Sequence, residues 1–332
     1  MREAPVAAAE APPAKARRSR TLRQQEARAG LTLLSPTLIV VLAVVVLPIL
    51  WTILIAFQRL RLRDLRRSGI FGAELTLRNF ETVLTSSGFL SALKVTLIYS
   101  VVGTTLSIGL GLVAALVVRK PFRGRTLVRA SMLLPYVAPV VAVTFVWEVL
   151  LHPELGLVNA LGADLLGWKD PIPFLDQRSG TLSIFGLDVG LPTALIVLLA
   201  YQAWRYFPFS FLFILARLQA LPADLDEAAR VDGATPLQRF RHITLPQLKG
   251  VIALLAVLRF IWTFNEFDDV YLLTEGGAGT EVVSVRVFRY LTGRGDVGAA
   301  AALSLVLAAV LAVLLLLYFR FFVGRSRDAE AI

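Results

Sequence analysis

The polar stretch Leu221–Pro246, LPADLDEAARVDGATPLQRFRHITLP, lies between two long apolar runs. Pro222 suits the first turn of a helix, where its missing N–H costs nothing. One helical face follows at the spacing i, i+3, i+4 and i+7, formed by Leu225, Ala228, Ala229 and Asp232. Gly233 is then a suitable left-handed helix stop. The first half of the stretch therefore predicts one short helix.

A second helix start follows directly. Thr235 is a suitable N-cap, Pro236 suits the first helical position, and Gln238 completes a capping box. Apolar side chains repeat at every third position, at Leu237, Phe240 and Ile243, and Pro246 predicts the end of this helix. We expect two short helices joined by a sharp bend. Small side chains on the first helix suit close docking of another protein, and an ordinary solvated loop is the alternative.

The composition is that of a membrane protein. Of 332 residues, 56% are hydrophobic and 17% charged, and the mean hydropathy is +0.70. In such a chain a net charge of +10 indicates basic flanks of membrane spans rather than a nucleic-acid partner. There is no cysteine, and the only histidines are His152 and His242. We therefore expect no metal site, no cofactor bound by this chain and no enzymatic activity.

Six apolar segments are long enough to span a bilayer, which takes about 20 residues. They are residues 33–57, 90–118, 127–151, 191–217, 250–273 and 298–323. The sequence thus predicts an all-α polytopic membrane protein with residues 33–323 as its membrane domain. Within the second segment, the small residues Gly103, Ser107 and Gly111 predict the close approach of a neighbouring helix.

The flanks of these segments predict the orientation. Residues 1–32 carry seven Lys or Arg and no apolar periodicity, which predicts a disordered basic tail, and residues 324–332 form a short second tail. The apolar run after residue 32 is too long for the core of a signal peptide. The side with the termini and Leu221–Pro246 carries 20 Lys and Arg, against 11 on the other. We therefore expect both termini in the cytoplasm.

One cluster disagrees with this bias. Directly after the first span, on the predicted outer side, lie Arg59, Arg61, Arg63, Arg66 and Arg67. An amphipathic segment at the membrane surface is one explanation. The sequence assigns no role to this cluster or to the basic tail.

The segment EAARVDGATPLQRFRHITLP closely resembles the EAA loop of binding-protein-dependent ABC importer permeases, which runs E-A-A, D-G-A, an aromatic residue and I-x-L-P. The matching residues are Glu227, Ala228, Ala229, Asp232, Gly233, Ala234, Phe240, Ile243, Leu245 and Pro246. Other stretches resemble the carbohydrate branch of this family (maltose, trehalose or glycerol phosphate type), in its first, maltose-type permease. They are Leu77–Phe80, Pro135–Trp147 with Gly156–Asn159, and Asn265–Gly277, which is followed by Ala278 where the signature has proline.

The resemblance implies the type I ABC importer permease fold in a bacterial or archaeal cell membrane. It also implies a second homologous permease, two copies of a cytoplasmic ATPase that binds ATP and Mg²⁺, and an extracytoplasmic solute-binding protein. This chain contains no G-x-x-x-x-G-K-[ST] motif. The residues that the resemblance assigns to ATPase coupling are Glu227, Ala228, Ala229, Asp232, Gly233 and Ala234. Glu227 is the expected anchor to a basic residue of the ATPase, and a solvated carboxylate is the alternative.

Polar side chains inside spans are costly and therefore mark candidate cargo contacts. In the fifth span, Arg259, Thr263 and Glu266 share one stripe, and the family's sugar contacts cluster in this part of the corresponding helix. The candidate cargo residues are Trp262, Asn265, Glu266, Tyr206, Phe209 and Ser210. Aromatic faces with planar polar groups suit a di- or oligosaccharide. The alternatives are an internal Arg259–Glu266 pair that only packs the bundle, and solvated carboxylates at Asp268 and Asp269.

Several functions stay open. Glycerol 3-phosphate or a polyamine is another cargo for such a permease, and a basic lining would favour the phosphate. An autonomous secondary transporter would show inverted repeats and ion sites. A membrane-embedded enzyme would need a convergent nucleophile, carboxylate pair or metal ligands. The sequence shows neither inverted repeats nor coupling-ion sites, and its two histidines and lack of cysteine argue against an enzyme. It does not identify the sugar, the ATPase or the binding protein.

Overall fold

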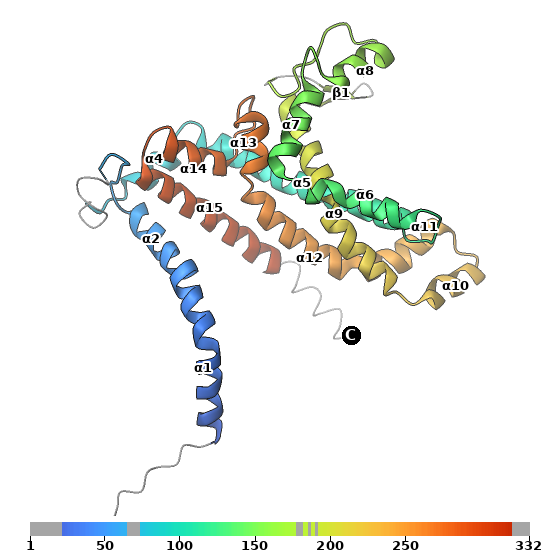
Figure 1. Cartoon of the computed structure of the whole chain (residues 1–332), viewed down its shortest axis with the longest axis horizontal. Coiled ribbons are helices and arrows are strands. Elements are labelled where there is room, and N and C mark those ends of the chain that lie inside the picture. The colour runs from blue at the N-terminus through green and yellow to red at the C-terminus, as the bar shows by residue number, and fades with distance from the viewer. Residues whose placement is uncertain (1–21, 65–73, 177–181, 185–186, 190–191, 321–332) are drawn as a thin grey trace, which may run out of the picture. The chain divides into compact units, whose positions relative to one another are not determined.

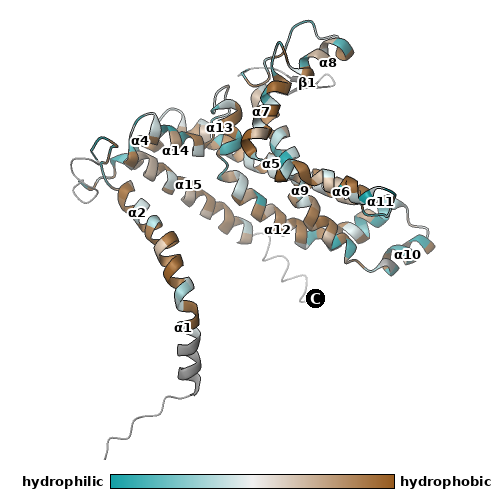
Figure 2. Cartoon of the chain, in the orientation of Figure 1, coloured by the Kyte–Doolittle hydropathy of each residue, from teal (hydrophilic) through white to brown (hydrophobic). Residues whose placement is uncertain are grey.

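The computed structural model describes residues 22–64, 74–176, 182–184, 187–189 and 192–320. The chain divides into two compact units, Met1–Thr52 and Ile53–Ile332. Figure 1 shows the helices and Figure 2 their hydropathy, which is apolar along the long helices and polar in the connections.

The first unit is helical throughout its described part. Helix α1 (Leu22–Val41) continues through a π turn, η1 (Leu42–Val46), into α2 (Leu47–Ala56). The apolar part, Gly30–Ala56, is long enough to span a membrane. The helix begins at Leu22, so residues 22–32 of the predicted tail are helical here, and residues 1–21 lie outside the described residues.

Four long helices dominate the second unit. They are α5 (Phe89–Val117), α9 (Thr193–Gln219), α12 (Leu245–Phe264) and α15 (Val297–Tyr318). Helix α5 packs along α9 and against α12. Shorter helices connect them, namely α4 (Arg78–Leu84), α8 (Leu157–Leu166), α10 (Ala223–Val231), α11 (Pro236–Arg239), α13 (Asp268–Thr274) and α14 (Val283–Thr292). Strands β1 (Leu182–Ile184) and β2 (Leu187–Val189) form an antiparallel pair, with Leu182 opposite Val189.

The predicted third span, residues 127–151, is broken rather than continuous. It consists of α6 (Arg125–Val137) and α7 (Val140–Leu151), which are bent by 96°. The break falls at Ala138, whose backbone is extended with ψ 143°. Pro139 follows, and a proline disfavours the helical conformation of the residue before it. With this pair counted as one span, the described residues contain up to six spans.

Pro246 does not end the second polar helix, contrary to the sequence prediction. Helix α11 runs through a π turn, η2 (Phe240–Thr244), into α12, so that Pro236–Phe264 is one long apolar helix. In the π turn the Leu245 N–H donates to the Phe240 carbonyl. Pro48 is likewise preceded by η1. A proline cannot donate the next helical hydrogen bond, and in both places a widened turn precedes the proline instead of a break.

The predicted fifth span also ends earlier than residue 273. Helix α12 stops at Phe264, and α13 follows as a separate short helix. At this end of the bundle, which is the end opposite α10 and α11 (Figure 1), α14 packs against α5, and α13 packs against α7 and α9.

The described part of the arginine cluster, residues 59–64, is not helical: a short bridge at Arg61 is followed by a turn at residues 62–64. The backbones of Arg61 and Asp296 form an isolated antiparallel β-bridge, and the Leu62 N–H donates to the Gly295 carbonyl at 2.8 Å. Leu60 is buried. This segment is therefore attached to the start of α15 at the same end of the bundle as α13. Arg66 and Arg67 lie outside the described residues.

Helices α5 and α9 approach each other at glycines, as the stripe of small residues predicts. Gly103, Ser107 and Gly111 are all buried. A Cβ atom at Gly111 would lie 2.8 Å from the Phe211 backbone nitrogen and 3.0 Å from the Phe207 carbonyl oxygen. The two backbones are thus in contact there.

This contact predicts a difference between two glycines of α5. Gly111→Ala is expected to lower the free energy of unfolding by about 1–3 kcal/mol, because the new methyl group meets backbone that must move. Gly109→Ala is the control: its Cβ meets nothing within 4 Å, so the better helix propensity of alanine should be neutral or slightly stabilising. Thermal unfolding in detergent measures both. Equal melting temperatures would contradict the close contact.

Candidate functional site

The bend between α10 and α11 is a complete Schellman motif. Gly233 has φ +78°, the left-handed conformation that only glycine adopts without strain. The Ala234 N–H donates to the Ala229 carbonyl at 2.9 Å, and the Gly233 N–H donates to the Arg230 carbonyl at 3.1 Å. The predicted stop at Gly233 is therefore confirmed, and Asp232 occupies the C-cap.

The start of α11 is a capping box, also as predicted. The Gln238 N–H donates to Thr235 Oγ1, and the Thr235 N–H donates to Gln238 Oε1 at 2.8 Å. The brace between the two helices is Asp226, which the sequence analysis missed. Its carboxylate pairs with Arg239 of α11 at 2.9 Å and with Arg230 of its own helix at 3.8 Å. Two caps and one ion pair thus fix the angle between α10 and α11.

The side chains proposed for coupling lie on the outside of this helix pair. Glu227 and Ala228 are exposed, and Ala229 and Ala234 are half-buried. Arg217, at the end of α9, donates to the Gln247 carbonyl at 3.3 Å and to its side-chain oxygen at 3.2 Å. These bonds join the end of α9 to the start of α12 where the helix pair leaves the bundle, while Glu227 and Ala228 stay accessible to a partner.

At mid-bundle, aromatic rings from three helices form one surface, which we call the aromatic face. Its members are Tyr136 of α6, Tyr206, Phe209 and Phe213 of α9, and Trp262 of α12. Phe209 is central: its ring centroid lies 5.1 Å from that of Trp262, 4.9 Å from that of Phe213 and 6.1 Å from that of Tyr136. Trp262 is 45% exposed, Phe213 41% and Tyr136 40%. This surface is open on one side.

Behind the aromatic face lies a buried polar network around Arg259. The guanidinium stacks on the Tyr206 ring, 4.1 Å from its centroid, and Nη2 donates to Thr263 Oγ1 at 3.2 Å. The Gln202 amide completes the network when its nitrogen donates to the Gly103 carbonyl (2.8 Å) and its oxygen accepts from Arg259 (2.8 Å) and Thr263 (3.0 Å). This network joins α5, α9 and α12.

Arg259 and Glu266 do not form the direct pair that the sequence left as an alternative. Tyr206 stands between them, and its hydroxyl donates to Glu266 Oε2 at 3.3 Å. The other oxygen, Oε1, accepts from the Asp269 N–H at 3.4 Å. Ser284 of α14 donates to the Glu266 carbonyl. The Glu266 carboxylate is thus held at one end of the aromatic face.

The remaining polar candidates from the sequence differ in their exposure and in their distance from the aromatic face. Asn265 is exposed near Glu266, and its amide donates to the Ile261 carbonyl of its own helix at 2.8 Å. Ser210 is buried against Gly111 of α5 and does not join the aromatic face. Asp268 is exposed. Asp269 is fully buried and lies 3.8 Å from Arg205, so it is not the solvated carboxylate that the sequence left open. Burial raises the pKa of the Asp269 carboxyl, and the Glu266 carboxylate raises it further.

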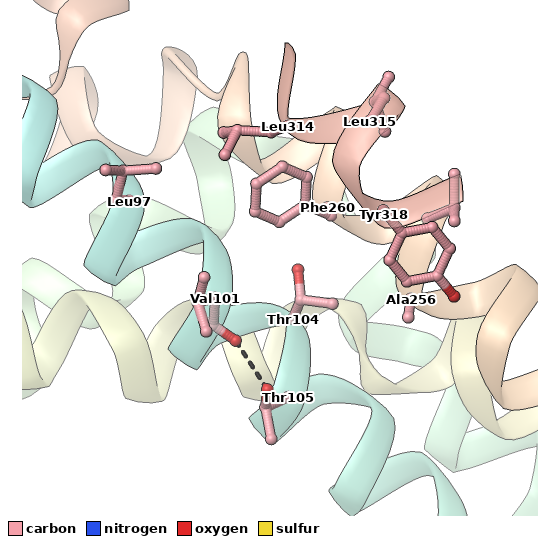
Figure 3. A pocket seen from close by; sticks show the side chains of 10 residues that line it. Leu97, Val101, Thr104, Thr105, Ala256, Phe260, Leu314, Leu315 and Tyr318 are labelled. Atoms are coloured by element: carbon pink, nitrogen blue, oxygen red, sulfur yellow. Dashed lines mark hydrogen bonds between the residues drawn. The ribbon is translucent and has the colours of Figure 1, made fainter. Parts of the chain in front are cut away.

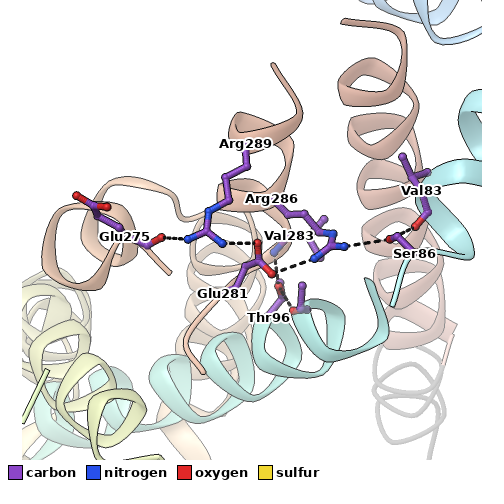
Figure 4. Close-up of polar contacts among 9 residues, drawn as sticks. Val83, Ser86, Thr96, Glu275, Glu281, Val283, Arg286 and Arg289 are labelled. Atoms are coloured by element: carbon purple, nitrogen blue, oxygen red, sulfur yellow. Dashed lines mark hydrogen bonds and ion pairs between the residues drawn. The ribbon is translucent and has the colours of Figure 1, made fainter. Parts of the chain in front are cut away.

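A second polar cluster holds the loop after α13 (Figure 4). Glu281 accepts from Arg286 at 3.0 Å and from Arg289 at 2.9 Å, and Arg289 also donates to the Glu275 carbonyl at 2.7 Å. Arg286 reaches Ser86 at 3.1 Å. This loop therefore forms a fixed platform at the end of the bundle opposite α10. It contains Ala278 at φ +48°, a value that proline cannot adopt, so the turn differs from one with proline at that position.

A large apolar groove lies between α5, α12 and α15 (Figure 3). Its volume is about 520 Å³, and its walls include Leu97, Val101, Phe260 and Leu314. The Thr105 hydroxyl donates to the Val101 carbonyl, so it is already engaged. The Thr104 hydroxyl also lines the groove and has no hydrogen-bond partner among the described residues. The other lining groups are nearly all apolar, so a hydroxyl-rich solute would leave most of its hydroxyls unpaired there. The groove therefore does not fit a polar cargo.

These features define a multi-pass helical membrane protein with an aromatic and polar site inside the bundle and a rigid two-helix projection at one end. Residues 107–326 match the family described as the inner membrane component of binding-protein-dependent transport systems. The chain belongs to this family.

Similar proteins are found in several organisms. The chain is 33% identical over 288 residues to the inner membrane ABC transporter permease protein YcjO of Escherichia coli, covering 87% of this chain and 92% of that protein. It is 33% identical over 313 residues to the trehalose/maltose transport system permease protein MalF of Thermococcus litoralis, covering 92% and 97%. The trehalose transport system permease protein SugA of Mycobacterium tuberculosis is 30% identical over 308 residues, with 93% of each chain covered.

The fold is also that of a solved transporter. A chain of a bacterial ABC transporter involved in the import of the acidic polysaccharide alginate matches with a TM-score of 0.73 at 23% identity, covering 90% of this chain and 97% of that one. The predicted type I ABC importer permease fold is thereby confirmed.

The buried network predicts the effect of removing one hydroxyl. Thr263→Val keeps the shape but removes an acceptor for Arg259 and a partner for Gln202, so the free energy of unfolding should fall by about 1–3 kcal/mol. Thr105→Val is the matched control, because that hydroxyl is exposed and bonds its own helix. Thermal unfolding of both variants tests this, and equal shifts would argue against the network.

Proposed function

We propose that this chain is one of two permease subunits of an ATP-driven importer that takes up a di- or oligosaccharide. The observation that carries the proposal is the aromatic face, open on one side and bounded by the Glu266 carboxylate and the Tyr206 hydroxyl. Sugar rings present apolar C–H surfaces and peripheral hydroxyls, which match aromatic rings flanked by fixed polar groups. The trehalose and maltose systems of its relatives support this cargo class.

Each cargo residue has a role in this proposal. Trp262 and Phe209 stack on the sugar ring, Glu266 and Asn265 accept or donate hydrogen bonds to its hydroxyls, and Tyr206 orients Glu266. Ser210 is assigned no contact, because it faces α5. A single chain supplies one wall of this site. The second wall is expected from the homologous partner permease.

In this proposal, the movement of the ATPase is transmitted to the membrane helices through α10 and α11. The complex is proposed to contain two copies of a cytoplasmic ATPase that carry ATP and Mg²⁺, and one copy docks on the Ala228–Ala229 side of this chain, with Glu227 as the charged anchor and Gly233 as the bend. The chain itself hydrolyses no ATP in this proposal. Both termini and the helix pair then lie in the cytoplasm, and an extracytoplasmic solute-binding protein delivers cargo at the end that carries α13 and α14.

A phosphorylated or cationic cargo fits less well. Along the aromatic face, the described cations are Arg259, which is 2% exposed and stacked on Tyr206, and Arg205, which is 8% exposed and beside Asp269. Neither offers its charge to a phosphate. The carboxylate at the face is Glu266 alone among the described residues, which is little for a polyamine. A neutral, hydroxyl-rich solute suits this surface better.

The cargo is tested in the assembled complex. ATPase activity in proteoliposomes should rise when the binding protein is loaded with one disaccharide of a panel that includes maltose and trehalose. Trp262→Ala should lower sugar uptake about tenfold or more, since stacking and shape are lost, whereas Leu254→Ala, an exposed apolar change elsewhere on α12, should not. Stimulation by no sugar in the panel would refute the sugar assignment and leave the importer assignment in place.

The bend is tested by two changes at one position. Gly233→Pro forces φ to about −65° and removes a hydrogen-bond donor, so uptake should be abolished while the subunit still inserts. The Cβ that Gly233→Ala adds has no heavy atom within 4 Å. The substitution costs only about 1–2 kcal/mol of backbone strain, so uptake should be largely kept. Both are measured as sugar uptake at matched membrane levels. Normal uptake by the proline variant would rule out a coupling role for the bend.

A further inference from the structure

Arg205 of α9 reaches two other elements from inside the bundle. Its Nη2 donates to the Ala138 carbonyl, the C-cap of α6 at the helix break, at 3.4 Å. Its Nε lies 3.8 Å from Asp269 Oδ1, in the first turn of α13. The Arg205 side chain is 10% exposed and the Asp269 side chain 0%. One guanidinium therefore joins the broken helix pair, α9 and α13.

Both of its contacts are long. Charge-assisted N–H···O bonds are normally about 2.7–2.9 Å, whereas here the distances are 3.4 and 3.8 Å. Within the described residues, neither oxygen of the buried Asp269 carboxylate accepts a hydrogen bond, and Arg205 Nε and Nη1 donate none. A buried ion pair is favourable only when its geometry is good and its remaining atoms are satisfied. Arg205 thus stands between two acceptors without a full bond to either.

The same pair is connected to the cargo site. The Asp269 N–H donates to Glu266, whose other oxygen accepts from Tyr206, the neighbour of Arg205 in the chain. On the opposite side, Trp147 of α7 packs edge-on against Tyr201 of α9, with 5.3 Å between ring centroids. A group that binds Glu266 would therefore contact a carboxylate that is hydrogen-bonded to the first turn of α13.

We propose that Arg205 and Asp269 form a latch that holds α13 against the α6–α7 break and exchanges its bonds during each transport cycle. In one state Arg205 bonds the Asp269 carboxylate in full, and in the other it bonds the carbonyls at the end of α6. Cargo contact at Glu266 biases the exchange, which links site occupancy to the position of the broken helix. The inference rests on the proposed importer function.

The test compares Asp269→Asn, Arg205→Gln and the double variant in the assembled complex in proteoliposomes. Asp269→Asn leaves the buried Arg205 guanidinium without its partner, and Arg205→Gln leaves the buried Asp269 carboxyl without its nearest cation, so each single variant is expected to reduce sugar uptake strongly. The double variant removes both charges and should insert at wild-type level. Its ATPase activity without binding protein should nevertheless be about fivefold or more above wild type, with stimulation by maltose- or trehalose-loaded binding protein lost.

Asp268→Asn is the matched control, since Asp268 is the exposed neighbour on α13. If the double variant has the same ATPase activity and the same stimulation by loaded binding protein as the control, the latch is overturned. Arg205 and Asp269 would then have only a packing role. The latch is supported if the double variant, at normal membrane level, has raised ATPase activity without binding protein and is no longer stimulated by loaded binding protein. If no sugar stimulates the wild-type complex, the sugar cargo is refuted. The latch is still tested in that case, because its readout is the ATPase activity without binding protein.

Discussion

The contact between the α5 and α9 backbones is the constraint on which the site depends. Because Gly103 and Gly111 carry no side chain, α9 lies close enough for Gln202 to reach the Gly103 carbonyl. Gln202 in turn holds Arg259, and Arg259 holds the Tyr206 ring that orients Glu266. A bulkier residue at Gly103 would collide with the Gln202 amide and disturb every later member of this chain.

Local sequence signals predicted local structure well. The stop at Gly233 and the Thr235 capping box depend on neighbours within a few residues, and both are confirmed. The small-residue stripe on α5 is also read from a short stretch, and the contact with α9 that it predicts is confirmed. The prolines show the limit of such signals. Pro139 breaks a helix, whereas Pro48 and Pro246 follow a π turn within one. The local sequence contains a missing donor in each case, but the surrounding helices decide how the chain accommodates it.

The candidate site was predicted in part for the same reason. A helical stripe in the sequence finds Arg259, Thr263 and Glu266, but it cannot show that Tyr206 of another helix stands between two of them. Tyr136, Phe213 and Gln202 were missed. Gln202, Tyr206, Phe209 and Phe213 follow at i, i+4, i+7 and i+11 on α9, so a stripe was present for that helix. Nothing in the sequence placed Tyr136 beside it, because that contact depends on the α6–α7 break.

The π turn η2 also has a torsional consequence. A π turn holds one residue more than an α turn, and one residue corresponds to a rotation of about 100° around a helix axis. The side chains of α11 are therefore turned about the axis of α12 relative to an unbroken α-helix. The direction in which the projecting helix pair faces is thus set by a single hydrogen-bond register between Phe240 and Leu245, several residues away from the side chains that dock.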